Sequence, residues 1–195
     1  MRPRIGSKLF LPLIATAALT FTTNNAFAAE ISGVKLPDQV TVGGKTLKLN
    51  GLGLRQATFI KFNVYAAGLY LENSSHDGDA IANSDQTKSI QMSFMRDVTA
   101  KQMSDAFQEG FDKNCVAGCT ELKPNIPKLQ ALMKDMKKGE TMAYNFTSDG
   151  VEVMIRGQKV GKVGDKAFSH QLLRVWIGKN PPNVELKDGF LSGKK

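Results

Sequence analysis

The spacing of the apolar residues changes period along this chain, and the order of these changes restricts the fold more than any other feature. Apolar residues that alternate with polar ones are typical of half-buried strands, whereas a recurrence every three or four positions is typical of amphipathic helices. The helical spacing begins at 99–113, where Thr99 is the expected N-cap. The other predicted elements are helices at 125–138 and 165–177, a short helix or turn at 184–191, and strands at 31–44, 45–58, 59–71, 88–98, 141–147, 151–155 and 158–161.

Strands come first in this order, then helices, then a strand meander and a closing helix. Ser148-Asp149-Gly150 separates two alternating segments and is typical of a hairpin turn. No internal repeat or long linker interrupts the pattern. The sequence therefore predicts a single α+β domain with a large, mostly antiparallel sheet.

Residues 1–28 have the composition of a cleavable secretory signal. Three basic residues lie in the first eight positions, 9–21 is largely apolar, and Ala26-Phe27-Ala28 supplies the small residues of a cleavage site. The apolar run is too short for a comfortable membrane span, and no longer run follows it. We predict a signal peptide over 1–28 and one domain over 29–195, exported to the periplasm, with full secretion as the open alternative.

The net charge of +8 suggests a nucleic-acid partner, but the distribution of the charge argues against one. Three of the basic residues lie in 1–28, and the first acidic residue of the chain is Glu30. The later Lys and Arg residues are dispersed rather than gathered in a stripe. The two histidines, His76 and His170, lie in no metal-binding or catalytic triad pattern. We therefore expect no nucleic-acid partner, no metal and no cofactor.

Cys115 and Cys119 are the two cysteines of the chain. Gly118 permits a tight turn between them, and an exported protein meets an oxidising compartment, so we predict one small structural disulfide. Metal binding is an alternative, but no third Cys or His lies nearby to complete a site. A redox role is another, although redox pairs more typically have two intervening residues.

The segment Gly51-Leu-Gly53-Leu-Arg55 suggests a ligand site. Its glycines let a strand bend or approach another element closely. Arg55 lies where the hydrophobic pattern restarts, and an arginine drawn into an apolar cleft needs an acidic partner or an anionic ligand. A surface arginine, or one paired with an internal carboxylate, is the alternative.

Several motifs together resemble the chalcone isomerase-like family. The resemblance covers nearly all of 29–195 and rests on Gly51-x-Gly53-x-Arg55, Phe59-Ile-Lys61-Phe62, Gly68-Leu-Tyr70-Leu71, Leu173-x-Val175-Trp176-Ile-Gly178-x-x-Pro181 and Leu186-Lys-x-Gly189, the last two typical of its bacterial exported branch. It implies a large antiparallel sheet, helices on one face, a few short strands on the other, and a ligand cleft between sheet and helices.

The resemblance also implies a function for Arg55. In the plant enzymes an arginine at this position steadies the phenolate that attacks the enone, which is electrostatic stabilisation of a developing charge. Their threonine falls on Asn63, with Tyr65 as a nearby alternative, and their catalytic tyrosine falls on Met103, which cannot donate a hydrogen bond. Non-enzymatic relatives bind fatty acids, and the same arginine meets the carboxylate.

We therefore expect a small hydrophobic or anionic, fatty-acid-like ligand that binds Arg55 and Asn63 in a chamber lined by Met103 and Phe107. Ordinary core packing is the alternative for the two apolar residues. An intramolecular lyase of chalcone isomerase type that uses Arg55 with Asn63 or Tyr65 is the alternative function. Binding to another envelope protein is a third. The sequence identifies neither the ligand nor a protein partner.

Overall fold

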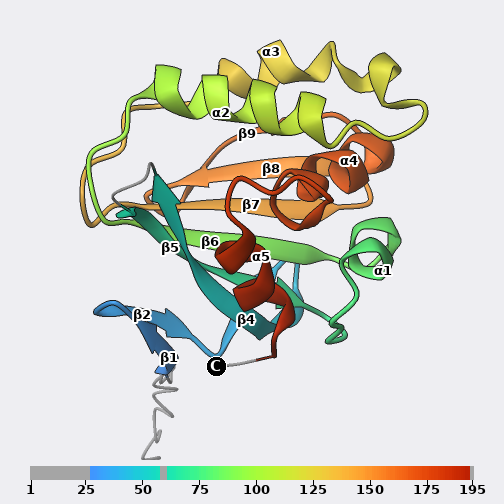
Figure 1. The fold of residues 1–195 in the computed structure, drawn as a ribbon. Helices are drawn as coiled ribbons and strands as arrows, with labels where there is room; N and C mark the ends of the chain where they lie inside the picture. Colours follow the sequence, from blue (N-terminus) through green and yellow to red (C-terminus); the bar gives the residue numbers. More distant parts are fainter. Residues whose placement is uncertain (1–26, 58–60, 194–195) are drawn as a thin grey trace, which may run out of the picture.

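The structure is a computed structural model that describes residues 27–57 and 61–193. Its centre is a seven-stranded antiparallel sheet in which every strand pairs with the next one along the chain (Figure 1). The strands are β3 (Gln39–Val42), β4 (Lys45–Ala57), β5 (Phe62–Leu71), β6 (Lys88–Phe94), β7 (Thr141–Thr147), β8 (Gly150–Ile155) and β9 (Gln158–Val163). The prediction of an α+β fold with an antiparallel sheet is confirmed.

Two layers cover the sheet. The main layer is helical and consists of α1 (Gly78–Asn83), α2 (Ala100–Lys113), η1 (Cys119–Leu122), α3 (Asn125–Gln130), α4 (Lys166–Ile177) and α5 (Val184–Leu191). On the other face a two-stranded hairpin, β1 (Phe27–Ile31) and β2 (Val34–Pro37), packs against β4 and β5. Within the described residues, no helix is both long and apolar enough to cross a membrane.

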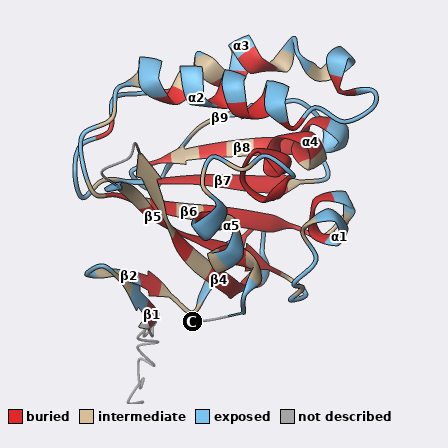
Figure 2. Ribbon diagram, viewed as in Figure 1, coloured by how far each residue is buried: buried red, intermediate tan, exposed pale blue. Residues whose placement is uncertain are grey.

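The alternation along β5 explains how both layers are held. Leu69 and Leu71 point into the large core under the helices, whereas Tyr70 points into a smaller core that includes Leu47 and Leu49. The Tyr70 hydroxyl donates to the carbonyl oxygen of Pro37 at 2.9 Å, which fastens the β1–β2 side. Figure 2 shows the buried residues concentrated in the central strands and α4, with the outer faces of α2 and α3 exposed.

The predicted helix at 99–113 is confirmed, and so is its cap. The Thr99 side chain accepts a hydrogen bond from the Gln102 backbone N–H, and the Gln102 side-chain oxygen accepts one from the Thr99 backbone N–H. This reciprocal pair is a capping box. The predicted helix at 125–138 is too long, because α3 ends at Gln130. Backbone hydrogen bonds between Val98 and Met136, at 2.8 and 2.9 Å, hold the following segment extended beside the end of β6.

The predicted signal peptide lies outside the described residues except for Phe27 and Ala28, the first two residues of β1. The strand pairs Glu30–Lys35 and Ile31–Val34 follow the predicted cleavage point, so β1 and β2 remain paired there in a domain that starts at Ala29. The domain boundary at 28 stays a prediction.

The structure contains the predicted disulfide between Cys115 and Cys119, whose Cα atoms are 5.5 Å apart. It closes the turn between the end of α2 and η1, and the Cys119 side chain is buried in the main core. The closed loop is short, so the entropy that the bond removes from the unfolded chain is worth about 2 kcal/mol.

We therefore expect reduction to lower the free energy of unfolding by about 2 kcal/mol, because only the unfolded chain gains freedom when the bond opens. Urea denaturation with and without a reductant measures this difference. The double variant Cys115→Ala, Cys119→Ala is the control, since a reductant cannot change its midpoint. Equal midpoints for the oxidised and reduced wild-type protein would contradict the prediction.

Candidate ligand-binding pocket

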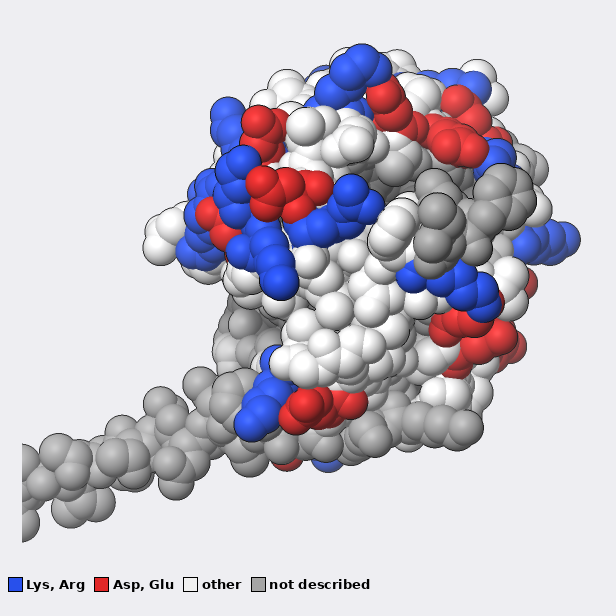
Figure 3. Space-filling model, turned by 60° about the vertical axis from the view of Figure 1, so that its left-hand side comes forward, with Lys and Arg blue, Asp and Glu red and all other residues white. Residues whose placement is uncertain are grey.

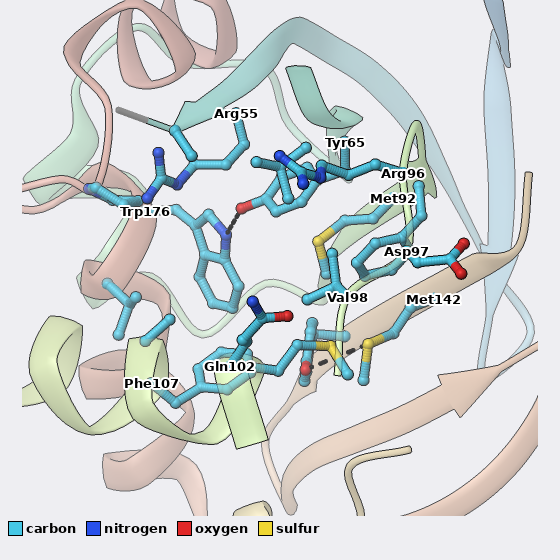
Figure 4. Close-up of a pocket in the computed structure, with 18 residues that line it drawn as sticks. Arg55, Tyr65, Met92, Arg96, Asp97, Val98, Gln102, Phe107, Met142 and Trp176 are labelled. Carbon is cyan, nitrogen blue, oxygen red and sulfur yellow. Dashed lines mark hydrogen bonds between the residues drawn. The ribbon is translucent and has the colours of Figure 1, made fainter. Parts of the chain in front are cut away.

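A pocket of about 340 Å³ lies between the sheet and helices α2 and α4 (Figure 4). Most of its lining is apolar and comes from both the sheet and the helices, including Val64, Met92, Phe94, Met103, Ala106, Phe107, Met142, Val175 and Trp176. The polar side chains of the lining are Arg55, Tyr65, Arg96, Asp97, Gln102 and Tyr144. An apolar chamber with a few polar groups is the usual form of a small-molecule site.

The strand register brings the first polar groups together. Arg55 of β4 pairs with Tyr65 of β5, and Tyr65 pairs with Phe94 of β6. Residues that pair directly across strands project from the same face, so these three side chains form one row on the helical side. The rings of Tyr65 and Phe94 meet edge to face, with their centroids 5.8 Å apart.

A β-bulge changes the face on which the residues of β5 before Tyr65 lie. Gln56 follows Arg55 directly but pairs with Asn63, so Val64 is an extra residue on its strand. Asn63 is not among the residues that line the pocket, and its side-chain oxygen accepts from Gln56 Nε2 at 2.9 Å. Spacing alone puts Asn63 and Tyr65 on one face, and the bulge separates them. We leave Asn63 out of the proposed binding set.

Tyr65 is an uncharged hydrogen-bond donor in the pocket. Its hydroxyl oxygen accepts from Trp176 Nε1 at 3.1 Å, which leaves the hydroxyl proton available to a ligand. Burial raises the pKa of Tyr65, an effect opposed by the hydrogen bond from Trp176 and by the positive charge of Arg55. The phenol therefore stays protonated at neutral pH.

Arg55 lies half-buried beside this hydroxyl. One of its Nη atoms donates to the backbone oxygen of Gln56, which orients the guanidinium. No Asp or Glu of the described residues forms an ion pair with Arg55, so the alternative of an internal carboxylate partner finds no support within that part of the chain. A cation in this position has N–H donors left over for an anion.

Met103 and Phe107 line the pocket from α2, and both are also buried. The Phe107 ring lies edge to face against Tyr144 at 5.3 Å and Trp176 at 5.6 Å between centroids. Met103 shares the lining with two further methionines, Met92 and Met142. Thioether side chains are flexible and adapt to different shapes, so this wall can adjust to an apolar ligand.

Sequence reasoning missed the functional position of Trp176 and Arg96. Trp176 stood inside a family-like motif, but only the packing of α4 on the sheet brings its indole N–H to Tyr65. Arg96 follows the end of β6, and no local signal marks it.

On the face shown in Figure 3, Lys and Arg lie among Asp and Glu around an uncharged area, and they form no continuous basic stripe there.

The fold is α+β: an antiparallel meander sheet is covered by a helical layer, and an apolar pocket lies between the two. The sequence model of the chalcone isomerase-like proteins matches residues 28–192. The chain belongs to the chalcone isomerase-like family, so the predicted family is confirmed, and the bacterial exported branch stays a prediction.

A solved structure shows the same fold. The crystal structure of a fatty-acid binding protein of Arabidopsis thaliana matches with a TM-score of 0.65 and 20% sequence identity, over 82% of this chain and 92% of that chain. No curated protein sequence matches the chain.

Proposed function

We propose that this protein binds a small amphiphile with an anionic head, of the fatty-acid class, in the pocket between the sheet and helices α2 and α4. The observation that carries the proposal is a half-buried Arg55 that forms no ion pair with a described carboxylate, in the same apolar pocket as a Tyr65 hydroxyl whose proton is available to a ligand. The fold shared with a fatty-acid binding protein supports it.

The two halves of such a ligand match the two parts of the site. A carboxylate accepts charge-assisted hydrogen bonds from Arg55 and a further one from the Tyr65 hydroxyl. The chain enters the space lined by Met92, Met103 and Phe107, where each buried methylene contributes about 0.8 kcal/mol. A volume of about 340 Å³ is within the range of small-molecule sites.

The lining favours binding over catalysis. Its described residues include no His, Lys, Cys or Glu. Of the other acid–base groups, Asp97 is bound by Lys137 and Lys138, and burial raises the pKa of Tyr65 and Tyr144, which keeps both phenols protonated. Met103 contributes a thioether where the plant enzymes have a tyrosine, so one donor for a developing enolate is missing. We also propose that the protein is exported and acts in the periplasm, which the intact mass of the purified protein tests through the loss of 1–28.

Decanoate titration tests the binding proposal. Trp176 is the single tryptophan of the chain and lines the pocket, so its fluorescence reports on occupation. We expect a saturable change with one ligand per protein, and calorimetry should give the same stoichiometry. If decanoate causes neither a fluorescence change nor heat, the proposal is wrong.

Tyr65→Phe should weaken decanoate binding about tenfold, because the ligand loses one hydrogen bond to its charged head. Calorimetry measures the change without depending on the fluorescence of the nearby Trp176. Tyr70→Phe is the matched control, because it removes a hydroxyl on the opposite face of the sheet. Equal losses in both variants would indicate a general effect on folding and would contradict a direct contact.

A further inference from the structure

We propose that the ligand's head carries two negative charges, as a phosphate monoester does, and that it lies between Arg55 and Arg96. The inference rests on the proposed function: it keeps the amphiphile with an anionic head and replaces the carboxylate of a fatty acid by a head with two charges. Both arginines line the same pocket. The argument depends on the placement of the two arginines, on their lack of ion pairs within the described residues and on the neutral donors that line the same pocket.

Arg96 approaches the site from the other side of Tyr65. It follows Phe94 by two residues, and Phe94 is the β6 partner of Tyr65, just as Arg55 is its β4 partner. The Arg96 guanidinium lies over the exposed ring of Phe62, 5.7 Å from its centroid, which steadies the side chain by a cation–π contact. Figure 4 shows the Arg96 guanidinium beside the ring of Tyr65 and the Arg55 guanidinium beyond the Tyr65 hydroxyl, near Trp176.

The arginines of the described residues divide into two pairs. Arg156 and Arg174 each form an ion pair with a carboxylate elsewhere in the fold. Arg55 and Arg96 form none with the described residues, although both line the pocket. A single carboxylate offsets one of these two charges and leaves the other without an anion, whereas a dianionic head offsets both.

The neighbouring acidic groups are already bound. Asp97 lines the pocket, but its carboxylate accepts from the backbone N–H of Lys138 and from Lys137 Nζ, both at 3.0 Å, and it points away from Tyr65 (Figure 4). Glu109 on α2 accepts from Lys113 Nζ at 2.5 Å; Lys113, with a smaller contribution from Arg55, lowers the pKa of Glu109, but Glu109 forms no ion pair with Arg55. Neither carboxylate therefore replaces an anionic ligand between the arginines.

Neutral donors complete the site. The Tyr65 hydroxyl has its proton free, and Gln102 has an unused amide N–H₂ group because its oxygen accepts from the Thr99 backbone N–H at 2.9 Å. A phosphate monoester presents three strong acceptor oxygens, one more than a carboxylate has. Four donor side chains, Arg55, Tyr65, Arg96 and Gln102, line the same pocket and match such a head better than they match a carboxylate.

Decyl phosphate and decyl sulfate test the inference at pH 8. They share the chain and the tetrahedral head, but the sulfate carries one charge and the phosphate two, since its second pKa is about 6. We expect calorimetry on the wild-type protein to show about tenfold tighter binding of the phosphate. Arg96→Gln should weaken both ligands, the phosphate more, so that the ratio falls below about threefold.

Lys128→Gln is the matched control, because it removes one exposed positive charge from α3, outside the pocket, and should keep the wild-type ratio. Equal affinities of the wild-type protein for the two ligands, or an unchanged ratio in Arg96→Gln, would overturn the inference while decanoate binding still stands. Binding of none of the three amphiphiles would overturn the proposed function as well. Inorganic phosphate that binds as tightly as decyl phosphate would show that the chain contributes nothing, which contradicts an amphiphile.

Discussion

Arg55→Gln is expected to weaken decanoate binding by about 30-fold, the largest effect of any single change in the pocket. Arg55 pairs across the strands with Tyr65, and its guanidinium forms no ion pair with a carboxylate of the described residues. A hydrogen bond to a charged group contributes about 2 kcal/mol, which corresponds to this factor. Glutamine keeps N–H donors, so the loss reports the charge and the fork geometry of arginine.

Calorimetric titration with decanoate measures this loss, and thermal denaturation shows whether the variant is folded. We expect a melting temperature close to that of the wild type, because Arg55 stabilises no ion pair within the described residues. Arg156→Gln is the matched control, since it removes an arginine outside the pocket that pairs with Glu140. Wild-type affinity in a folded Arg55→Gln variant would show that the head of the ligand lies elsewhere.

Gly51→Ala is expected to destabilise the fold by about 3 kcal/mol, because helix α5 lies directly on this part of β4. A Cβ atom at Gly51 would lie 2.2 Å from the backbone oxygen of Gly189 and 2.7 Å from that of Phe190. Both obstacles are backbone atoms, so α5 as a whole must shift. That movement would disturb Leu186 and Phe190, which are fully buried in the main core.

Urea denaturation measures the loss for Gly51→Ala. Lys48→Ala is the control, because it changes an exposed position of the same strand and should alter stability by no more than about 0.5 kcal/mol. The chain enters α5 from Pro182, which lines the pocket, so the Gly51 variant should also bind decanoate more weakly. A wild-type midpoint would contradict the close packing of α5 against β4.

Much of the fold follows from local signals in the sequence. The alternation of apolar residues in 88–94 and 141–147 depends only on which face of a strand each residue occupies. The cap at Thr99 depends on groups three residues apart. A helix was missed at α1 because a polar stretch conceals it, although Asp77 caps it through the backbone N–H groups of Asp79 and Ala80.

Errors arose where distant segments compete with a local pattern. The apolar stripe of 125–138 continues past Gln130, yet the backbone of Met136 bonds to Val98, and a long-range bridge replaces the last helical turns. Asn63 has the correct spacing for a place beside Tyr65, but the extra residue Val64 changes the face. A bulge depends on the partner strand, so spacing along one strand does not reveal it.

The sequence by itself determined the order of strands and helices, the family, Arg55 as the cation of interest and the cysteine pair. These features are readable because they depend on residues close together in the chain or on a motif in a known order. Only the tertiary structure decided that Arg55, Tyr65, Arg96 and Trp176 surround one pocket. They come from β4, β5, the end of β6 and α4, and such a meeting depends on strand register and helix packing across the whole domain.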